Sequence, residues 1–209
     1  LERAGNFKHP EKGEASISCF PVVETQDGDL TSYIVSNLMS ITDGHIFFDS
    51  NVFAQGRRPA INIPLSVTRV GRQTQDKIAK DMNRELHSLL TIYEKSESLS
   101  HFGTEMTESV KGTFLLGDKV YHFFNQPGGL ILPREIYMTI FALVWLNILN
   151  DHESIDSARK ALLTSCEDEA NQMLLKSLLN ADSLNDFLKN VRDNAILIEP
   201  LWKENATKR

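Results

Sequence analysis

Arg69 is the residue whose type and position most clearly allow chemistry. It stands near the end of the β-prone run SVTRV. Its guanidinium is planar and permanently charged, so it can contact two phosphate oxygens at once, whereas the ammonium of lysine offers only a compact point charge. The same position also suits an arginine that pairs with a carboxylate at a strand end. An isolated arginine leaves both interpretations open, and the surrounding sequence has to decide between them.

The histidines and cysteines indicate no metal chemistry. Neither HExxH nor any other paired ligand spacing occurs, and Cys19 and Cys166 lie far apart without a CxxC pattern. This excludes a disulfide framework and a zinc cluster, so we expect reduced thiols inside a cell or organelle and no metal site. We expect surface or structural roles for the histidines, which are His9, His45, His87, His101, His122 and His152.

Composition places the chain among globular proteins. It has 209 residues, of which 41% are hydrophobic and 24% charged, enough for one large domain or two small ones. The formal net charge of −6 argues against binding to nucleic acid through phosphate contacts. No apolar run reaches the roughly 18 residues that span a bilayer, so any membrane connection is expected through partners. The start, LERAG, reads as the end of a helix without a cap or methionine, which predicts a piece of a longer protein.

Two kinds of element have to position these residues. Up to about residue 72, short apolar runs separated by Gly, Asp and Pro predict alternating strands and helices. The individual predictions are a buried strand over 15–23, a helix over 29–38, a hairpin turn at Asp43-Gly44 and a core strand over 60–70.

From about residue 73 the apolar spacing becomes helical. One stripe begins at Ile78 and a second runs from Met106 to Phe124. Pro133 suits the first turn of a helix expected to reach Asn150. Further helical patterns cover 154–166, 168–179 and 184–191. The sequence therefore predicts an α/β part followed by an all-α bundle.

The order of short motifs between Phe20 and Gln75 carries more information than periodicity. ETQ-x-GD at Glu24–Asp29 is followed by SITDG-x-IF at Ser40–Phe47 and by RPAIN with SVTRVG at Arg58–Gly71. This series resembles the second half of the RecA-like, P-loop nucleotide-binding domain of the F-type ATP synthase alpha subunit. Dense resemblance covers about residues 15 to 75, and weaker resemblance reaches about Gln126. The ETQ-x-GD and SVTRVG segments favour alpha over the homologous beta subunit.

The resemblance implies a role for Arg69 in a neighbouring subunit. In ring-shaped ATPases an arginine finger neutralises charge on the γ-phosphate bound by the next subunit. Arg69 matches that finger, and Ser40 matches a family serine at the same interface, although a hydroxyl before an Asp-Gly turn is as readily a local turn partner. The implied domains are the carboxy-terminal part of a RecA-like domain at 1–72 and a helical bundle at 73–209.

The resemblance also implies a non-catalytic nucleotide site. Arg58 and Pro59 match positions near the adenine, and Gln126 matches the first glutamine of a QxQ segment. Gly128 stands where the second glutamine would be, which leaves retention of this site open. The sequence contains no G-x-x-x-x-G-K-[ST] phosphate loop, and family order places that loop before Leu1. ATP or ADP with Mg²⁺ is therefore expected to be held mainly by residues outside this chain.

The implied partners are a beta-type subunit in an alternating hexamer and a gamma-type central stalk, without nucleic acid. The implied place is the periphery of an energy-transducing membrane, on a bacterial cytoplasmic face or an organelle inner membrane. After Pro133 the sequence departs from ordinary alpha subunits, which leaves open a divergent or F1-like paralogue. Two alternatives remain: a non-catalytic assembly module derived from an alpha subunit, and a Rho-like helicase, which the acidic charge and the motif pair disfavour.

Overall fold

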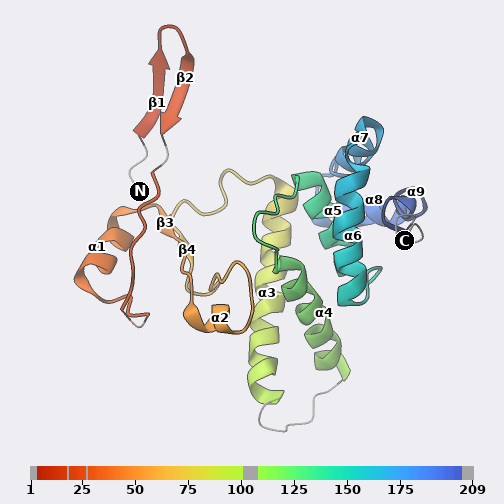
Figure 1. The fold of residues 1–209 in the computed structure, drawn as a ribbon, viewed down its shortest axis with the longest axis horizontal. Coiled ribbons are helices and arrows are strands. Elements are labelled where there is room, and N and C mark those ends of the chain that lie inside the picture. Colours follow the sequence, from red (N-terminus) through yellow and green to blue (C-terminus); the bar gives the residue numbers. More distant parts are fainter. Residues whose placement is uncertain (1–3, 18, 27, 101–107, 204–209) are drawn as a thin grey trace. The chain divides into compact units, whose positions relative to one another are not determined.

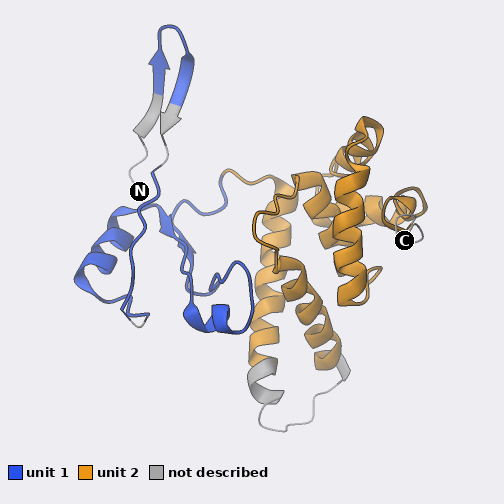
Figure 2. Ribbon diagram, viewed as in Figure 1, with its two compact units in different colours: residues 1–73 blue, residues 74–209 orange. Residues whose placement is uncertain are grey.

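The computed structural model describes residues 4–17, 19–26, 28–100 and 108–203, and it shows a mostly helical protein with small sheets (Figure 1). The chain divides into two compact units, Leu1–Gln73 and Thr74–Arg209, called unit 1 and unit 2 below (Figure 2). Each unit is built differently, and each is described by itself.

Unit 1 consists of short strands and short helices joined by long connections. Two antiparallel pairs, β1 with β2 and β3 with β4, make its sheets. Its elements are β1 (Ala4–His9), β2 (Gly13–Ile17), α1 (Tyr33–Ile41), β3 (Gly44–His45), α2 (Ser50–Ala54) and β4 (Val67–Thr68).

Local chemistry explains several features of unit 1. Gly13 starts β2 with a φ of 75°, a left-handed conformation that glycine adopts without steric cost. Gly44 pairs with Thr68, and a Cβ there would lie 2.5 Å from the carbonyl oxygen of Val67, so only glycine permits this approach. Asp49 caps α2 by accepting from the backbone N–H of Asn51.

Few of the described side chains of unit 1 are buried. Among the described residues its buried side chains are Val35, Thr42 and Ala60. Phe20 is 83% exposed and Val22 97% exposed. Among its described residues, unit 1 therefore carries apolar side chains of the kinds that form cores, and few of them are buried.

Unit 2 is a bundle of helices around one continuous core. α3 packs against α4, α4 against α5 and α6, and α10 against α6. Its helices are α3 (Lys77–Ser100), α4 (Glu108–Phe124), α5 (Arg134–Trp145), α6 (His152–Ser165), α7 (Glu169–Leu178), α8 (Leu184–Asp193), α9 (Ala195–Ile198) and α10 (Pro200–Lys203). Most of α5 is buried because it is apolar on all sides.

Capping side chains define where helices of unit 2 begin. Asp151 and Ser154 form a reciprocal capping box at the start of α6. Ser183 accepts from the backbone N–H of Asp186 at the start of α8. Gly117 lets α4 approach α3, since a Cβ there would lie 2.5 Å from the ring of Tyr93.

The predictions for unit 1 are partly wrong. Ala4 and Gly5 belong to β1 rather than to a helix end, and residues 1–3 lie outside the described part. The strand predicted over 15–23 stops at Ile17, and the chain from Cys19 onward is not paired as a strand.

Two further errors in unit 1 concern strand pairing. Asp43-Gly44 does not close a hairpin, because α1 precedes it and the partner of β3 is the distant β4. The strand predicted over 60–70 is broken by a turn at 63–65, which leaves a bridge at Ile61 and the short β4. The predicted helix at 29–38 is present as α1, shifted toward the carboxyl end.

The helices predicted for unit 2 are confirmed, with different ends. α6, α7 and α8 match the three patterns after residue 150. The helix after Pro133 ends at Trp145 rather than Asn150, and Asn147 takes a left-handed conformation with a φ of 56°. Met106, where the second stripe was expected to start, lies outside the described residues. Cys19 is exposed, Cys166 is half-buried, and neither is paired with another cysteine in the described residues.

Candidate functional site

Arg69 lies directly after β4 and is exposed to solvent. Its backbone N–H donates to the carbonyl oxygen of Asp43 at 2.7 Å, which extends the β3–β4 pairing by one bond. Its guanidinium Nη1 donates to the carbonyl oxygen of Ser40 at 2.5 Å. The structure thus brings two of the predicted site residues together.

Ser40 contributes through its main chain. Its hydroxyl donates to the carbonyl oxygen of Asn37 at 2.7 Å, a bond within α1. Thr42 closes the same helix, because its backbone N–H and its hydroxyl both donate to the carbonyl oxygen of Leu38. Carbonyl groups at a helix carboxyl end carry partial negative charge, so this end favours a guanidinium. The end of α1 therefore holds Arg69 in place electrostatically.

A cavity of about 240 Å³ opens beside this contact. Typical pockets for whole small molecules measure about 300–1,000 Å³. The cavity is therefore smaller than a typical pocket for a whole small molecule. Its lining residues are Leu30, Ser36, Met39, Ser40, Gly44, His45, Val67 and Arg69.

The segment that leads into this cavity is ordered by a local turn. Thr31 donates to a carboxylate oxygen of Asp29 from its hydroxyl at 2.6 Å and from its backbone N–H at 2.8 Å. These two bonds hold the pKa of Asp29 below its ordinary value. Asp29, the last residue of the ETQ-x-GD motif, thus stabilises the turn beside Leu30.

Arg58 is folded onto its own chain. Its Nη1 donates to the carbonyl oxygens of Phe53 and Arg57, both at 2.8 Å, and its guanidinium lies 3.5 Å from the centre of the Phe53 ring. Pro59 follows it and is exposed. Arg58 does not line the cavity beside Arg69. Its predicted place near an adenine stays a prediction.

Gln126 belongs to unit 2, in the connection between α4 and α5. Its side chain is half-buried, while Gly128 and Gly129 form an exposed turn. Gly129 has a φ of 80°, which suits a glycine turn between helices. Because Arg58 and Gln126 lie in different units, their shared role in a nucleotide site stays a prediction.

Metal ligands do not cluster in the described residues, where no group of three or more His, Cys, Asp or Glu side chains could hold an ion. Nor does that part of the chain contain a helix with the length and apolar character needed to cross a membrane.

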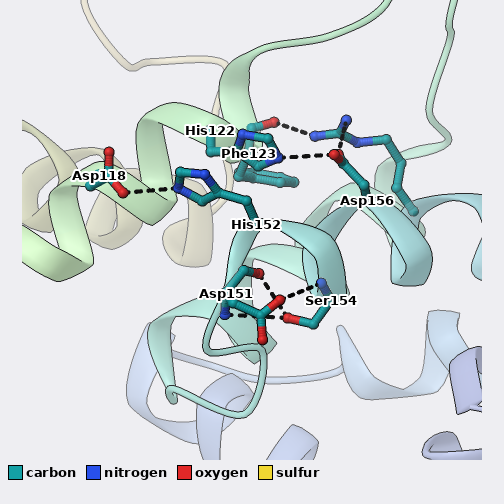
Figure 3. A network of polar contacts seen from close by, with 8 residues as sticks. Asp118, His122, Phe123, Asp151, His152, Ser154 and Asp156 are labelled. Carbon is teal, nitrogen blue, oxygen red and sulfur yellow. Dashed lines mark hydrogen bonds and ion pairs between the residues drawn. The ribbon is translucent and has the colours of Figure 1, made fainter.

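The structure also assembles a group of side chains that the sequence patterns did not single out. His122 of α4 and His152 at the start of α6 stack against each other, with aspartates around them (Figure 3). The sequence contains the same spacing of aspartate and histidine on both helices, in opposite order. Asp118 precedes His122 by one helical turn on α4, and His152 precedes Asp156 by one turn on α6.

Comparison with known proteins gives a consistent picture. Residues 1–68 match the model of the ATP synthase alpha/beta family, nucleotide-binding domain. Over its whole length the chain is 33% identical to ATP synthase subunit alpha 1 of Mycoplasmopsis pulmonis, of which it covers 39%. It is 31% identical to ATP synthase subunit alpha of Mesomycoplasma hyopneumoniae, over 92% of this chain and 39% of the relative. It is 42% identical to the alpha subunit of Mycoplasma pneumoniae, over 62% of this chain and 25% of that subunit.

The match lies in the carboxy-terminal part of these relatives. The chain spans about two fifths of the length of the first relatives it matches, since it covers 39% of each.

Proposed function

Because this chain belongs to the ATP synthase alpha/beta family, we propose that it is the carboxy-terminal part of an alpha-type subunit of a rotary F-type ATP synthase or ATPase. The observation that carries this proposal is the position of Arg69. It is exposed, it is held by the carbonyl oxygen of Ser40 at the end of α1, and it lines a cavity of about 240 Å³.

Arg69 acts as an arginine finger for a neighbouring beta-type subunit. A guanidinium has five N–H donors, and the bond from Nη1 to Ser40 leaves donors that can face phosphate oxygens. ATP supplies the phosphoryl group when bound. Arg69 then offsets the negative charge that develops on that group. Ser40 supports this action by holding the guanidinium through its carbonyl oxygen.

The rest of the chain has a place in the same proposal. Residues 1–72 form the carboxy-terminal part of a RecA-like domain, and residues 73–209 form the helical bundle. Arg58, Pro59 and Gln126 contribute to a non-catalytic nucleotide site. Most groups that hold ATP or ADP and Mg²⁺ lie outside this chain.

The complex we propose contains alternating alpha-type and beta-type subunits around a gamma-type stalk. It couples ATP chemistry to the passage of ions across an energy-transducing membrane. This chain reaches that membrane only through other subunits. The enzyme activity belongs to the complex, since Arg69 acts on a nucleotide held by its neighbour.

A second candidate is a non-catalytic assembly module derived from an alpha subunit. Gly128 favours it, because a glycine in an exposed turn stands where the resemblance places an adenine-contacting glutamine. In that case the surface around Arg69 serves for docking alone, and turnover by the complex does not depend on a guanidinium at position 69.

The decisive experiment replaces Arg69 in the assembled complex. Arg69→Ala should lower multisite ATP turnover by about 10³- to 10⁵-fold, as loss of an arginine finger does in related chemistry. Arg72→Ala is the matched control, since Arg72 is an exposed arginine three residues further along the chain. Both variants should assemble into the complex as the unmodified chain does, which size-exclusion chromatography measures.

Arg69→Lys separates the two candidates. It keeps the positive charge but loses the planar fork of the guanidinium. If Arg69 acts as an arginine finger, Arg69→Lys should therefore lose most of the ATP turnover. If both Arg69 variants assemble and turn over ATP normally, the finger is excluded and the assembly module stands.

A further inference from the structure

The connection between α4 and α5 is held at its start by a buried arginine of α6. Arg159 is 5% exposed, and its Nη2 donates to the carbonyl oxygen of Phe123 at 3.0 Å. Phe123 lies in the last turn of α4, and the connection begins two residues later at Asn125. Carbonyl groups in the last turn of a helix have no partner within that helix. Arg159 therefore supplies from α6 a bond that α4 cannot make for itself.

The guanidinium of Arg159 is oriented by its own helix. Its Nη1 donates to Oδ1 of Asp156 at 3.0 Å, one turn earlier on α6. Figure 3 shows Asp156 facing the end of α4, where Phe123 lies. The nitrogens of a guanidinium point in fixed directions within one plane, so the bond to Asp156 helps to direct Nη2 toward Phe123.

Stability alone does not account for this arginine. In the part of the chain that the structure describes, Nε of Arg159 is buried without a hydrogen-bond partner. A buried donor without a partner costs free energy, and a buried ion pair is often no more stabilising than apolar side chains of similar volume. What the arginine adds over an apolar residue is a fixed position for the end of α4.

The other end of the connection is held by a more exposed contact. Arg134, the first residue of α5, forms an ion pair with Asp76, which also accepts from the backbone N–H of Ala79 in the first turn of α3. The side chains of Arg134 and Asp76 are 56% and 43% exposed, and ion pairs in contact with solvent contribute little. The start of the connection is therefore fixed more firmly than its end.

We propose that Arg159 is a positioning residue for Gln126, and that it holds the end of α4 where Gln126 can meet the adenine of a nucleotide. This inference rests on the non-catalytic nucleotide site proposed above. Gln126 follows Phe123 by three residues. The backbone N–H of Asn125 donates to carbonyl oxygens of the last turn of α4, so hydrogen bonding continues up to the residue before Gln126. A shift of the end of α4 is therefore passed on to Gln126.

The residues after Gln126 give it less support. Pro127, Gly128 and Gly129 are exposed, and glycine leaves the backbone free to take many conformations. A side chain that has to be ordered during binding lowers the affinity, whereas one that is already in place does not. The contribution of Arg159 should therefore appear in the affinity for the base of the nucleotide.

The inference is tested on the assembled complex with 2-azido-ATP, a photoreactive analogue that attaches to residues around the adenine. Mass spectrometry measures the label on the peptide that contains Gln126, while ATP or tripolyphosphate competes for the site. Tripolyphosphate has no base, so it reports on the phosphate part of the site alone. The ratio of the affinities for ATP and tripolyphosphate therefore measures the contact with the base. A general loss of structure would lower both affinities.

Three substitutions give the expected order of effects on this ratio. Gln126→Ala should lower it roughly two- to tenfold, the range for one lost hydrogen bond. Arg159→Met keeps an apolar stem without donors and should lower it by a similar factor. Arg134→Gln should lower it about twofold or less, because its ion pair is half exposed.

Arg159→Lys and Asp156→Ala keep the test decisive if Arg159→Met does not assemble. Lysine keeps the charge but not the planar fork, so it should restore the ratio only in part. Asp156→Ala removes the partner that orients Arg159 at a position that is 44% exposed, and should lower the ratio by a smaller factor than Arg159→Met. An unchanged ratio in both variants would overturn the role of Arg159.

The outcomes separate this inference from the nucleotide site on which it rests. If the unmodified complex carries no label on the peptide with Gln126, the site itself is refuted, and the inference with it. If Gln126→Ala lowers the ratio and the Arg159 variants do not, the site stands and Arg159 has no positioning role. Ser183→Ala, which removes a helix cap elsewhere in unit 2, is the stability control. A loss as large in this control would also overturn the inference.

Discussion

Unit 1 and unit 2 use the same kinds of apolar side chain to opposite effect. In unit 2 Phe141 and Phe187 are 0% exposed and belong to one core. In unit 1 Phe20 is 83% exposed and lies in an extended segment without a strand partner. Burial of apolar surface is the main favourable term in folding, so unit 2 is expected to supply most of the stability of this chain.

The difference separates the residues proposed to act on a nucleotide from the residues expected to stabilise the chain. The predicted finger Arg69 and its contact with Ser40 belong to unit 1, where few described side chains are buried, whereas the continuous apolar core belongs to unit 2. Both tryptophans, Trp145 and Trp202, are in unit 2. Tryptophan fluorescence therefore reports on unit 2 alone, which makes the comparison measurable.

The largest expected effect comes from emptying the core of unit 2. Phe141→Ala should lower the free energy of unfolding by about 3–5 kcal/mol, because it leaves a cavity in a fully buried site. Urea unfolding followed by tryptophan fluorescence measures it. Phe20→Ala is the control, and a change at an exposed position should stay within about 0.5 kcal/mol. Similar losses for both in this signal would mean that the stability of unit 2 does not depend on its own core alone.

A second prediction concerns the close approach of α3 and α4. Gly117→Ala should destabilise unit 2 by about 1–3 kcal/mol, because the new methyl group would overlap the Tyr93 ring. Gly112→Ala on the same helix meets nothing within 4 Å and should instead stabilise by about 0.5–1 kcal/mol. Opposite signs in the same unfolding assay support the described packing, whereas equal signs contradict it.

Helix caps give a third, smaller contrast between the units. Ser183→Ala removes the hydroxyl that accepts from Asp186 at the start of α8 and should cost about 1 kcal/mol. Ser32 stands at the same position of α1 in unit 1 but makes no side-chain capping bond, so Ser32→Ala should change little. Amide hydrogen exchange of the first turn of each helix measures both. Equal loss of protection would show that α1 is capped after all.

The smallest expected effect depends on pH and lies in unit 1. The pKa of Asp49 is held below its ordinary value by hydrogen bonds, first from the Asn62 side chain and then from the Asn51 backbone. Its contribution is therefore present above the ordinary carboxyl pKa of about 3.9 and is lost as the pH falls through the lowered value. NMR of the α2 amides between pH 6 and 2 measures this loss.

Asn62→Ala provides the control for that measurement. It keeps the Asp49 carboxylate but removes its main hydrogen-bond donor, so α2 should open at a higher pH than in the unmodified chain. An unchanged midpoint would show that Asn62 does not hold Asp49.

The sequence predicted unit 2 better than unit 1 for a physical reason. A helix is made by residues close in sequence, so the apolar stripe from Ile78 could be read directly. A strand needs a partner that can lie anywhere, and the pairing of β3 with β4 leaves no periodic trace. The segment after Ile17 has the composition of a buried strand, yet it is unpaired and exposed among the described residues.

The candidate site shows the same limit. Motif order was enough to select Arg69 and Ser40, which the structure brings together. The place of Ser40 at a subunit interface stays a prediction, and its contact with Arg69 is made by the carbonyl oxygen, which motif order does not indicate. The stacking of His122 on His152 depends on how α4 and α6 pack, so the mirrored Asp and His spacing became meaningful only in three dimensions.

The bond from Arg69 to the Ser40 carbonyl has a consequence for genetics. Every amino acid has that backbone carbonyl, so substitutions at position 40 that leave α1 intact also keep the hydrogen bond to Arg69. Selection that preserves this contact would therefore not favour serine over other residues at position 40. It would appear instead as intolerance of changes that bend the end of α1, such as an insertion between Leu38 and Asp43.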